Sequence, residues 1–337
     1  MRLQLLVPHY HEEPEEVCPL LDSLYMQQGI SFEDFGVVIV FDGDEATPLP
    51  ETLWELKYPF HIKFVHVPHG GLPYARNVAL DNATADYVMF CDADDCFSHL
   101  CGLNMIFTEM DKGEFDTFTS LFVEETKLPD GNKPTFIHHK NDHTFVHGKV
   151  HRRQWLIDND LRFDETIPVH EDAYFNVLCD EVALPERKRY LPQDFYLWKW
   201  RDNSICRRDP DYLLKTFRWV LYGNGQTVDE LERRGLVDRA KFHCAFIIVD
   251  SYYRLQLPEW AMPENTHYRQ TALMCVADYM ENHKHLWNTI MMLDIMPITQ
   301  GCRMRYITQG MPMETQTMAQ WLAEVRSILP MTEETSS

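Results

Sequence analysis

DYVMFCDADD, residues 86–95, joins a run of four apolar or aromatic side chains to a cluster of three carboxylates, Asp92, Asp94 and Asp95. A short buried strand that ends in this way places oxygen ligands at the carboxyl edge of a sheet, where open α/β folds bind their ligands. Hard divalent cations such as Mg²⁺ and Mn²⁺ prefer oxygen ligands, and acidic groups so close together repel one another without a cation. An Asp-rich turn after a strand is the structural alternative.

Strand-like runs alternate with helical patterns in the first half of the chain. We expect strands at residues 4–7, 36–41, 62–67 and 87–91, and helices at residues 17–25 and 72–83. Pro8 is expected to end the first strand, and Pro14 lies near the start of the first helix. The run GVVIVF at residues 36–41 is apolar throughout, as a strand buried on both faces should be. This alternation predicts an α/β fold with a mainly parallel sheet and crossover helices.

The pattern becomes mixed beyond about residue 115. Strand-like runs at residues 117–123 and 195–200 flank a turn at residues 129–134, an irregular His-rich stretch, and helices near residues 152–159 and 171–178. Beyond about residue 206 strand signals largely vanish, and amphipathic patterns follow, for instance at residues 242–255 and 318–329. We therefore expect a first domain at residues 1–205 and a helical C-terminal domain at residues 206–337, on the acceptor side or at an oligomer interface. The final TEETSS is expected to be a frayed tail.

Composition limits the partners and the compartment. The chain of 337 residues has a formal net charge of −21 at pH 7, which disfavours non-specific attraction to nucleic acid or anionic lipid. No run approaches the roughly 20 apolar residues that span a bilayer, and the apolar start of the chain is short for a signal peptide. We therefore expect a cytoplasmic protein without stable membrane insertion. Nine cysteines without a CxxC pair predict reduced thiols rather than a disulfide framework or a zinc ribbon.

Polar loops follow the four predicted strands of the first half: PHYHEE at residues 8–13, DGDE at 42–45, HGGLPYARN at 69–77 and the aspartates at 92–95. In a parallel sheet such loops emerge at one edge and can converge on one ligand. Gly70 and Gly71 permit a close backbone approach to a ligand, and the following helix start offers N–H groups to an anion. Arg76 can add a charged fork for a phosphate or a base edge. With a cation at the aspartates as a Lewis acid, this set suits a pyrophosphate that leaves during a reaction.

These residues, in this order, resemble family 2 glycosyltransferases of the GT-A fold. HGGLPYARNVALDNATADYVMFCDADD at residues 69–95 is similar to the family's donor-binding core, N-G-G-x-x-x-A-R-N-x-G-L followed by a strand and D-x-D-D. Further family segments match the first strand and helix, VVIVFDGD at residues 37–44, VHGKVHRRQWLIDNDLRFDETIPVHEDAYF at 146–175 and WKWRDNSI at 198–205. The resemblance covers about residues 2–206 and implies a Rossmann-like, mainly parallel mixed sheet flanked by helices that binds a nucleotide-sugar donor.

The resemblance also implies roles for individual residues. Asp92 and Asp94 match the ends of the DXD motif, which contact the nucleotide ribose and the metal, so both are expected ligands of Mn²⁺ or Mg²⁺, with Asp95 in support. Asp172 matches the catalytic base that takes the proton of the acceptor hydroxyl in an inverting transfer, and the adjacent Glu171 is also expected at the catalytic site. A charged helix N-terminus is the structural alternative for this acidic pair. The residues expected to bind the donor are Pro8, Tyr10, Glu12, Asp42, Gly71, Arg76, Asp92 and Ala93.

Two departures from the family pattern bear on the substrates. Phe41 stands where the family has an Asp that often contacts the base, which leaves Asp42 as the only Asp before the glycine. The nucleotide is therefore open, with uridine as the default. The Q-x-x-R-W motif of processive polysaccharide synthases is absent from the sequence, so one sugar per encounter is expected.

Several aromatic and imidazole side chains leave more than one reading open. Among the five histidines after the predicted turn, His143, His147 and His151 are four residues apart, as in a metal-binding helix. A glycine inside this stretch and its irregular family counterpart favour surface or acceptor-cleft histidines instead, with His147 the first candidate for substrate contact. Trp198 and Trp200 could stack on a sugar face or pack in the core.

The sequence therefore predicts a metal-dependent, inverting glycosyltransferase that moves a single sugar from a UDP-sugar to a hydroxyl group. A glycan or a lipid-linked oligosaccharide is the expected acceptor. Hydroxymethylated bases of viral DNA form a second acceptor class, against which the acidic charge argues. A non-catalytic nucleotide-sugar-binding protein is the remaining alternative, against which the complete set of acidic residues argues. An oligomer formed through the C-terminal helices is compatible with the sequence.

Overall fold

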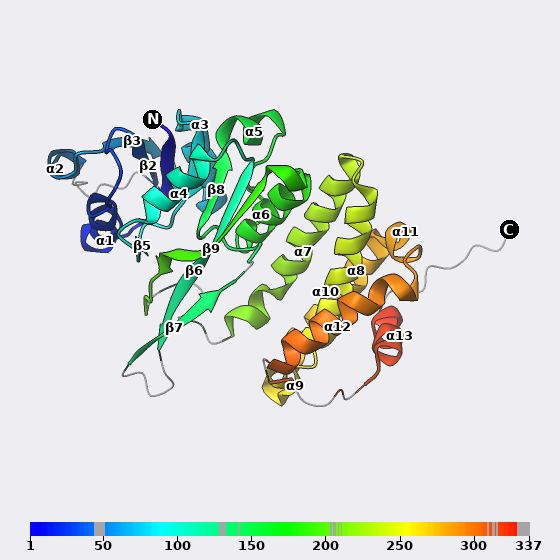
Figure 1. Ribbon diagram of the computed structural model, residues 1–337. Helices are drawn as coiled ribbons and strands as arrows, with labels where there is room; N and C mark the ends of the chain where they lie inside the picture. The colour runs from blue at the N-terminus through cyan, green and yellow to red at the C-terminus, as the bar shows by residue number, and fades with distance from the viewer. Residues whose placement is uncertain are drawn as a thin grey trace. The chain divides into compact units, whose positions relative to one another are not determined.

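The computed structural model describes residues 1–43, 51–127, 133–140, 142–202, 204, 207, 209, 211–308, 310–311, 314 and 316–328. The chain forms two compact units, Met1–Ser204 and Ile205–Ser337, which are drawn in Figure 1. The division falls one residue before the boundary expected between residues 205 and 206.

The first unit is built from strands and helices that alternate in its first half. Its strands are β1 (Leu3–His9), β2 (Phe35–Asp42), β3 (His61–Val67), β4 (Tyr87–Phe90), β5 (Cys96–Phe97), β6 (Thr117–Lys127), β7 (Pro134–His139), β8 (Lys149–Arg152) and β9 (Lys188–Trp198). Its helices are α1 (Pro14–Tyr25), α2 (Glu51–Lys57), α3 (Leu72–Asn82), α4 (Gly102–Asp111), α5 (Arg153–Asp158) and α6 (Glu171–Val182).

The strands form one mixed sheet in the order β3-β2-β1-β4-β8-β6-β9-β5, with β7 paired to β6 beyond this path. The first four strands in this order are mutually parallel, β8 runs antiparallel to β4 and β6, and β6 and β9 are parallel. The carboxyl ends of β1, β2, β3 and β4 therefore lie at one edge of the sheet, where the polar loops were expected to converge.

Helices cover both faces of the parallel part of the sheet, which explains why its central strands are apolar throughout. Leu3, Leu5 and Val7 of β1 pack with side chains of α1 and α4 in one core cluster. Alternate side chains of a strand point to opposite faces, so Leu6 and Phe90 face the other side, where α3 contacts β1 and Phe90 meets Phe175 of α6. Every residue of β1 and β2 is buried, as a strand between two helical layers should be.

The predicted α/β class and most predicted elements of the first unit are confirmed. The expected strands correspond to β1, β2, β3, β4, β6 and β9, and the expected helices to α1, α3, α5 and α6. The first helix begins at Pro14, whose missing N–H costs nothing there, and the Glu13 N–H donates to Glu16 Oε2 at 2.9 Å. All described cysteines are free thiols, as expected.

Other expectations about the first unit were wrong or incomplete. Pro8 does not end the first strand: β1 continues to His9, and Pro8 lies opposite Val40 of β2. The His-rich stretch is not wholly irregular, because it contains β7 and β8, and α2 was not foreseen. Asp44 and Glu45, most of the turn expected at residues 129–134, and the C-terminal tail lie outside the described residues.

The second unit is helical in its described residues, as the amphipathic patterns predicted. Its helices are α7 (Tyr212–Arg233), α8 (Val237–Arg254), α9 (Pro258–Ala261), α10 (Thr266–Asn282), α11 (Lys284–Trp287), α12 (Met292–Thr308) and α13 (Met318–Ile328). Buried Asp250 of α8 accepts a hydrogen bond from Tyr306 Oη at 2.8 Å and pairs with Arg254 at 3.2 Å. Across the described residues, no helix combines the length and the apolarity needed to cross a bilayer.

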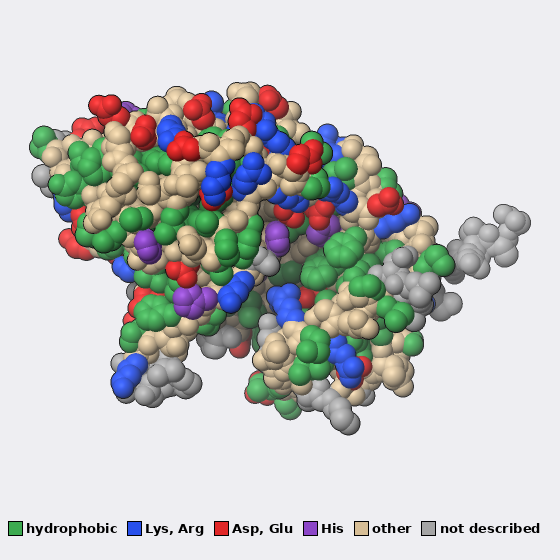
Figure 2. Space-filling view, in the orientation of Figure 1, with side chains coloured by type: hydrophobic (Ala, Val, Ile, Leu, Met, Phe, Trp, Pro, Cys, Tyr) green, Lys and Arg blue, Asp and Glu red, His purple; other side chains and the backbone are tan. Residues whose placement is uncertain are grey.

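Charged side chains of both signs share the surface. On the face in Figure 2, Lys and Arg side chains lie among Asp and Glu side chains over the first unit. The described residues on this face therefore form no continuous basic stripe of the kind that tracks a phosphate backbone.

Gly148 precedes β8 at a position that only glycine fits. Its φ is +67°, and an added Cβ would lie 2.4 Å from Ser120 Oγ, which itself donates to the carbonyl of Gly148 at 3.0 Å. Gly148→Ala should therefore lower the free energy of unfolding by about 1–3 kcal/mol, measured by urea denaturation. Gly113→Ala is the control, because Gly113 also has a positive φ but an added Cβ there meets nothing within 4 Å. A smaller loss for Gly148→Ala than for Gly113→Ala would contradict the crowding at Ser120.

Candidate active site

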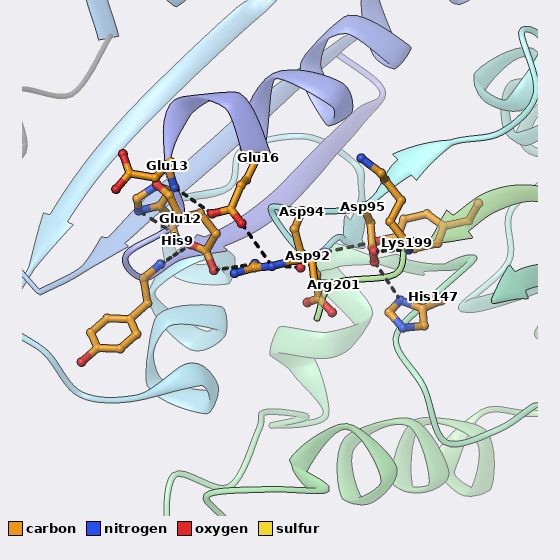
Figure 3. A network of polar contacts seen from close by, with 12 residues as sticks. His9, Glu12, Glu13, Glu16, Asp92, Asp94, Asp95, His147, Lys199 and Arg201 are labelled. Carbon is orange, nitrogen blue, oxygen red and sulfur yellow. Dashed lines mark hydrogen bonds and ion pairs between the residues drawn. The ribbon is translucent and has the colours of Figure 1, made fainter. Parts of the chain in front are cut away.

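Four loops deliver the polar residues of the candidate site to the carboxyl edge of the parallel strands. They follow β1, β2, β3 and β4, whose register aligns these ends. Figure 3 shows side chains of the first and fourth loops, together with Arg201 after β9 and His147 before β8, in one polar network. Segments more than 100 residues apart in sequence, such as Asp94 and Arg201, are thus brought together.

Asp42, at the end of β2, organises the loop after β3. Its Oδ1 accepts the N–H of Gly70 at 2.6 Å, and its Oδ2 accepts the N–H of Gly71 at 3.0 Å and lies 2.9 Å from Nδ1 of His69. The anion that meets these two glycine N–H groups is therefore a side chain of the protein. The N–H groups expected to meet an anion were those of the helix start that follows, and that expectation stays a prediction.

Tyr10 forms the exposed part of the same corner. Its ring is about half exposed and stacks on the ring of His69, with centroids 4.5 Å apart and planes 20° from parallel. An aromatic face supported in this way can take a further flat ring such as a nucleobase. Pro8, in contrast, is buried within β1, and its expected contact with the donor stays a prediction.

Arg76 of α3 is buried and holds two carboxylates. Its Nη2 donates to Asp92 Oδ1 at 2.8 Å, and its Nη1 donates to Glu171 Oε1 at 2.5 Å. Only 2% of Arg76 is exposed, so its described partners are these carboxylates rather than a phosphate or a base edge. Arg76 thereby joins the aspartate turn after β4 to the first residue of α6.

The three aspartates after β4 have different partners. Asp94 accepts a hydrogen bond from Arg201 Nη1 at 2.8 Å. Asp95 is fully buried and accepts hydrogen bonds from Tyr196 Oη at 2.7 Å and from the N–H of Lys199 at 2.9 Å; Ala93, between Asp92 and Asp94, is also buried. Burial and the neighbouring Asp94 and Asp92 raise the pKa of Asp95 well above its usual range. Burial would also raise the pKa of Asp92, but Arg76 more than offsets it and holds this pKa below its usual value.

Arg201 sits among three carboxylates and was not among the predicted site residues. Besides Asp94, it approaches Glu16 at 3.3 Å and Glu12 at 3.8 Å (Figure 3). Burial, with Asp94 nearby, raises the pKa of Glu12 to about 7. The Glu12 Oε2 also accepts the N–H of Tyr10 at 2.6 Å, which fixes the loop after β1. Within WKWRDNSI the arginine was visible, but nothing local indicated these distant partners.

Glu171 and Asp172 begin α6, as predicted. His170, just before them, has a φ of +65°, a left-handed conformation that turns the chain sharply into the helix. Burial and the adjacent Glu171 raise the pKa of Asp172 to about 7, against the opposing effect of Arg76. Asp172 remains partly exposed, whereas Glu171 is buried on Arg76. Glu171 thus holds the arginine, and the Asp172 side chain keeps part of its surface accessible.

The histidines of the stretch do not behave as one group. His138 and His143 are exposed, but His147 and His151 are each only 3% exposed, so the surface interpretation was wrong for these two. His147 lies among the rings of Tyr196 and other aromatic residues, and its Nδ1 is 3.7 Å from Asp95 Oδ2. Burial lowers the pKa of His147 to about 4, so the ring is neutral. Its burial also argues against direct substrate contact.

The fold and the site together define a class of protein. A Rossmann-like mixed sheet, with an aspartate turn at the carboxyl edge of its parallel strands and a second acidic pair at the start of a later helix, is what the resemblance to GT-A nucleotide-sugar-dependent transferases implied. Residues 5–161 match the model of Glycosyl transferase family 2. The first unit therefore carries a family 2 glycosyltransferase domain, and the predicted family and fold are confirmed.

Individual known proteins agree with this assignment. EpsJ of Bacillus subtilis (strain 168), named an uncharacterized glycosyltransferase, is 28% identical over 224 residues, which are 60% of this chain and 62% of EpsJ. The chain thus spans less than two thirds of that relative's length. Among solved structures, S. aureus TarS 1–349 in complex with UDP has a TM-score of 0.57 at 17% identity and covers 94% of each chain.

A second solved structure shows the same fold. The mannosyltransferase PcManGT from Pyrobaculum calidifontis, in complex with GDP-Man and Mn²⁺, has a TM-score of 0.50 at 15% identity and covers 96% of this chain and 85% of its own. At these identities the likeness of both structures shows the fold alone.

Replacing Arg76 should be far more costly than replacing a surface arginine. Arg76→Gln leaves the buried Glu171 and the partly exposed Asp92 without their cation, so the free energy of unfolding should fall by about 3–5 kcal/mol. Arg162→Gln is the matched control, because Arg162 pairs with Asp81 at 2.5 Å on the surface, where such a pair contributes less than about 1 kcal/mol. Urea denaturation of both variants measures the difference. Equal losses would show that Arg76 does not hold the site together.

Proposed function

We propose that this chain is a metal-dependent, inverting glycosyltransferase that moves one sugar from a UDP-sugar to a hydroxyl group. The observation that carries the proposal is the double contact of Arg76, which fixes the aspartate turn and the acidic pair of α6 beside one another. A donor bound at the turn and a base on the helix must be neighbours for transfer to occur. The family 2 domain supports the same reaction class.

The donor nucleotide would lie along the loops after β1, β2 and β3. Tyr10, stacked on His69, offers an exposed aromatic face for the base, and Asp42 holds the loop that contains Gly71. Uridine is the proposed base, since the solved TarS complex of the same fold contains UDP. The Phe41 that replaces the family's usual Asp is buried, so base recognition would depend on Tyr10 and on backbone groups of these loops.

The residues around the aspartate turn fit a divalent cation. Asp92, Asp94 and Asp95 would supply oxygen ligands, and of these three Asp92 pairs with Arg76 and Asp94 with Arg201. A cation bound here would act as a Lewis acid that stabilises the departing diphosphate. Arg201 would reach the same diphosphate, because a guanidinium that leaves Asp94 can pair with phosphate oxygens in the same way. The PcManGT structure contains Mn²⁺.

Asp172 is the proposed catalytic base. As a carboxylate it would take the proton of the acceptor hydroxyl while that oxygen attacks the anomeric carbon from the side opposite the leaving nucleotide. Glu171 would act through Arg76, as a positioning residue. A base with a pKa near 7 is well matched to proton transfer at neutral pH.

The acceptor is proposed to be a glycan or a lipid-linked oligosaccharide. Modified DNA is disfavoured, because the formal net charge is −21 and the described face in Figure 2 shows no continuous basic stripe. A role of the helical second unit on the acceptor side or in an oligomer, and a cytoplasmic location, stay predictions.

Replacing the proposed base tests the reaction directly. Asp172→Asn preserves shape but cannot accept a proton, so the transfer rate should fall by about 10²–10⁴-fold while the Kd for UDP changes little. Asp180→Asn is the control, because Asp180 lies on the same helix and pairs with Lys188 at 2.9 Å. Calorimetric UDP binding and a transfer assay give the two readouts. Full transfer activity in Asp172→Asn would remove the assignment of the base.

The pH dependence has a defined direction. Below its pKa of about 7 Asp172 is protonated and cannot serve as a base, so kcat/KM should rise as pH increases through 7 and then level off. The measurement is kcat/KM of transfer between about pH 5 and about pH 9. A profile that is flat across this interval, or that falls as pH rises through 7, would be inconsistent with Asp172 as the base.

A further inference from the structure

Asp92, Asp95 and His147 form a group that could hold a metal ion. One possible ligand atom from each residue lies within 4.8 Å of the others, and no further group of this kind occurs among the described residues. Figure 3 shows His147 directed at Asp95 from the side opposite Asp94 and Arg201. The resemblance to the family pointed to Asp92 and Asp94 and gave no reason to include a histidine.

The imidazole of His147 is fixed in place and has an unused nitrogen. Its ring stacks on Tyr196 with centroids 5.1 Å apart and planes 19° from parallel, and on Phe145 at 5.7 Å and 10°. Its side chain is only 3% exposed, so Nδ1 is shielded from water, and this atom makes no hydrogen bond within the protein. Buried polar atoms are nearly always paired, so an unpaired nitrogen aimed at a carboxylate needs an explanation.

The spacing suits a cation between His147 and Asp95. The Nδ1 of His147 is 3.7 Å from Asp95 Oδ2, which is too long for a hydrogen bond. Two ligands of one cation, each about 2.1 Å from it, lie about 3–4 Å apart. The widest separation in the group, up to 4.8 Å, would close with a small side-chain adjustment.

The distribution of charge around the aspartate turn also favours a cation next to Asp95. Asp92 is paired with Arg76 and Asp94 with Arg201, whereas fully buried Asp95 accepts hydrogen bonds from two neutral donors, the Tyr196 hydroxyl and the Lys199 N–H. A buried carboxylate without a cationic partner is costly. A divalent ion at this position would supply the missing charge.

We propose that Asp92, Asp95 and His147 are the protein ligands of the divalent cation when no donor is bound, and that His147 makes the site selective for Mn²⁺ over Mg²⁺. The inference rests on the proposed function only in using the same aspartate turn. An imidazole ligand suits first-row transition metals, whereas Mg²⁺ strongly prefers oxygen. In this donor-free state Asp94 remains paired with Arg201, at the observed distance of 2.8 Å.

The test is Mn²⁺ binding to the full chain without nucleotide, followed by electron paramagnetic resonance. The wild-type protein should bind Mn²⁺ with a ¹⁴N modulation from a directly bound imidazole, and Mg²⁺ should compete only in large excess. His147→Gln should remove the ¹⁴N modulation and weaken Mn²⁺ binding by at least about 10-fold. His139→Gln is the matched control, since His139 also stacks on an aromatic ring of this region, Phe122 at 4.4 Å, but lies outside the group.

Two results would overturn the inference. One is bound Mn²⁺ in the wild-type protein without ¹⁴N modulation, a readout that does not depend on the folding of any variant. The other is loss of Mn²⁺ binding in Asp94→Asn together with unchanged binding in His147→Gln, which would make Asp94 the ligand instead. A transfer assay separates this inference from the proposed function: sugar transfer with Mn²⁺ that shows no ¹⁴N coupling would retain the function and remove His147.

Discussion

The contact of one buried guanidinium with two carboxylates fixes the geometry on which the rest of the site depends. Arg76 lies 2.8 Å from Asp92 and 2.5 Å from Glu171, residues that are far apart in sequence and belong to different elements. Without this cation, the carboxylates of the buried Glu171 and the partly exposed Asp92 would repel each other, and each would take up a proton more readily. The apolar strands of the sheet provide the rigid support, but it is this ion pair that places the aspartate turn beside the start of α6.

The negative charges of the other acidic residues in the site are balanced by different neighbours. Arg201 pairs with Asp94 and lies close to Glu12 and Glu16. Asp95 receives hydrogen bonds from neutral donors and faces the imidazole of His147. The site therefore combines a buried part around Arg76, a more exposed part around Arg201, and a group of possible metal ligands around Asp95.

Local signals account for what could be predicted from the sequence. The apolar runs of β2 and β4, the turn glycines before α3 and the aspartates after β4 are each encoded within a few residues, so periodicity and residue type sufficed. The end of β1 was predicted wrongly because a proline inside a strand is rare. In the structure, β1 continues through Pro8 and ends at His9. The strands β7 and β8 were missed because polar and histidine residues hid the alternation that marks a strand.

The partners of the site residues could not be foreseen for a different reason. The contacts of Arg76 with Glu171, of Arg201 with Asp94 and of His147 with Asp95 join segments brought together only by the sheet topology. The sequence indicated which residues carry chemistry, and the resemblance to the family supplied Asp172, but neither could tell which cation compensates which carboxylate. That distribution of charge is a tertiary property.

The most direct test of the account is the distance between a bound Mn²⁺ and the phosphorus atoms of UDP on this protein, measured by paramagnetic relaxation of the ³¹P signals. If the aspartate turn holds the cation that stabilises the leaving diphosphate, the β-phosphorus should lie within about 3–4 Å of the metal, as direct coordination requires. Weak relaxation that places the diphosphate far from the metal would contradict the central claim.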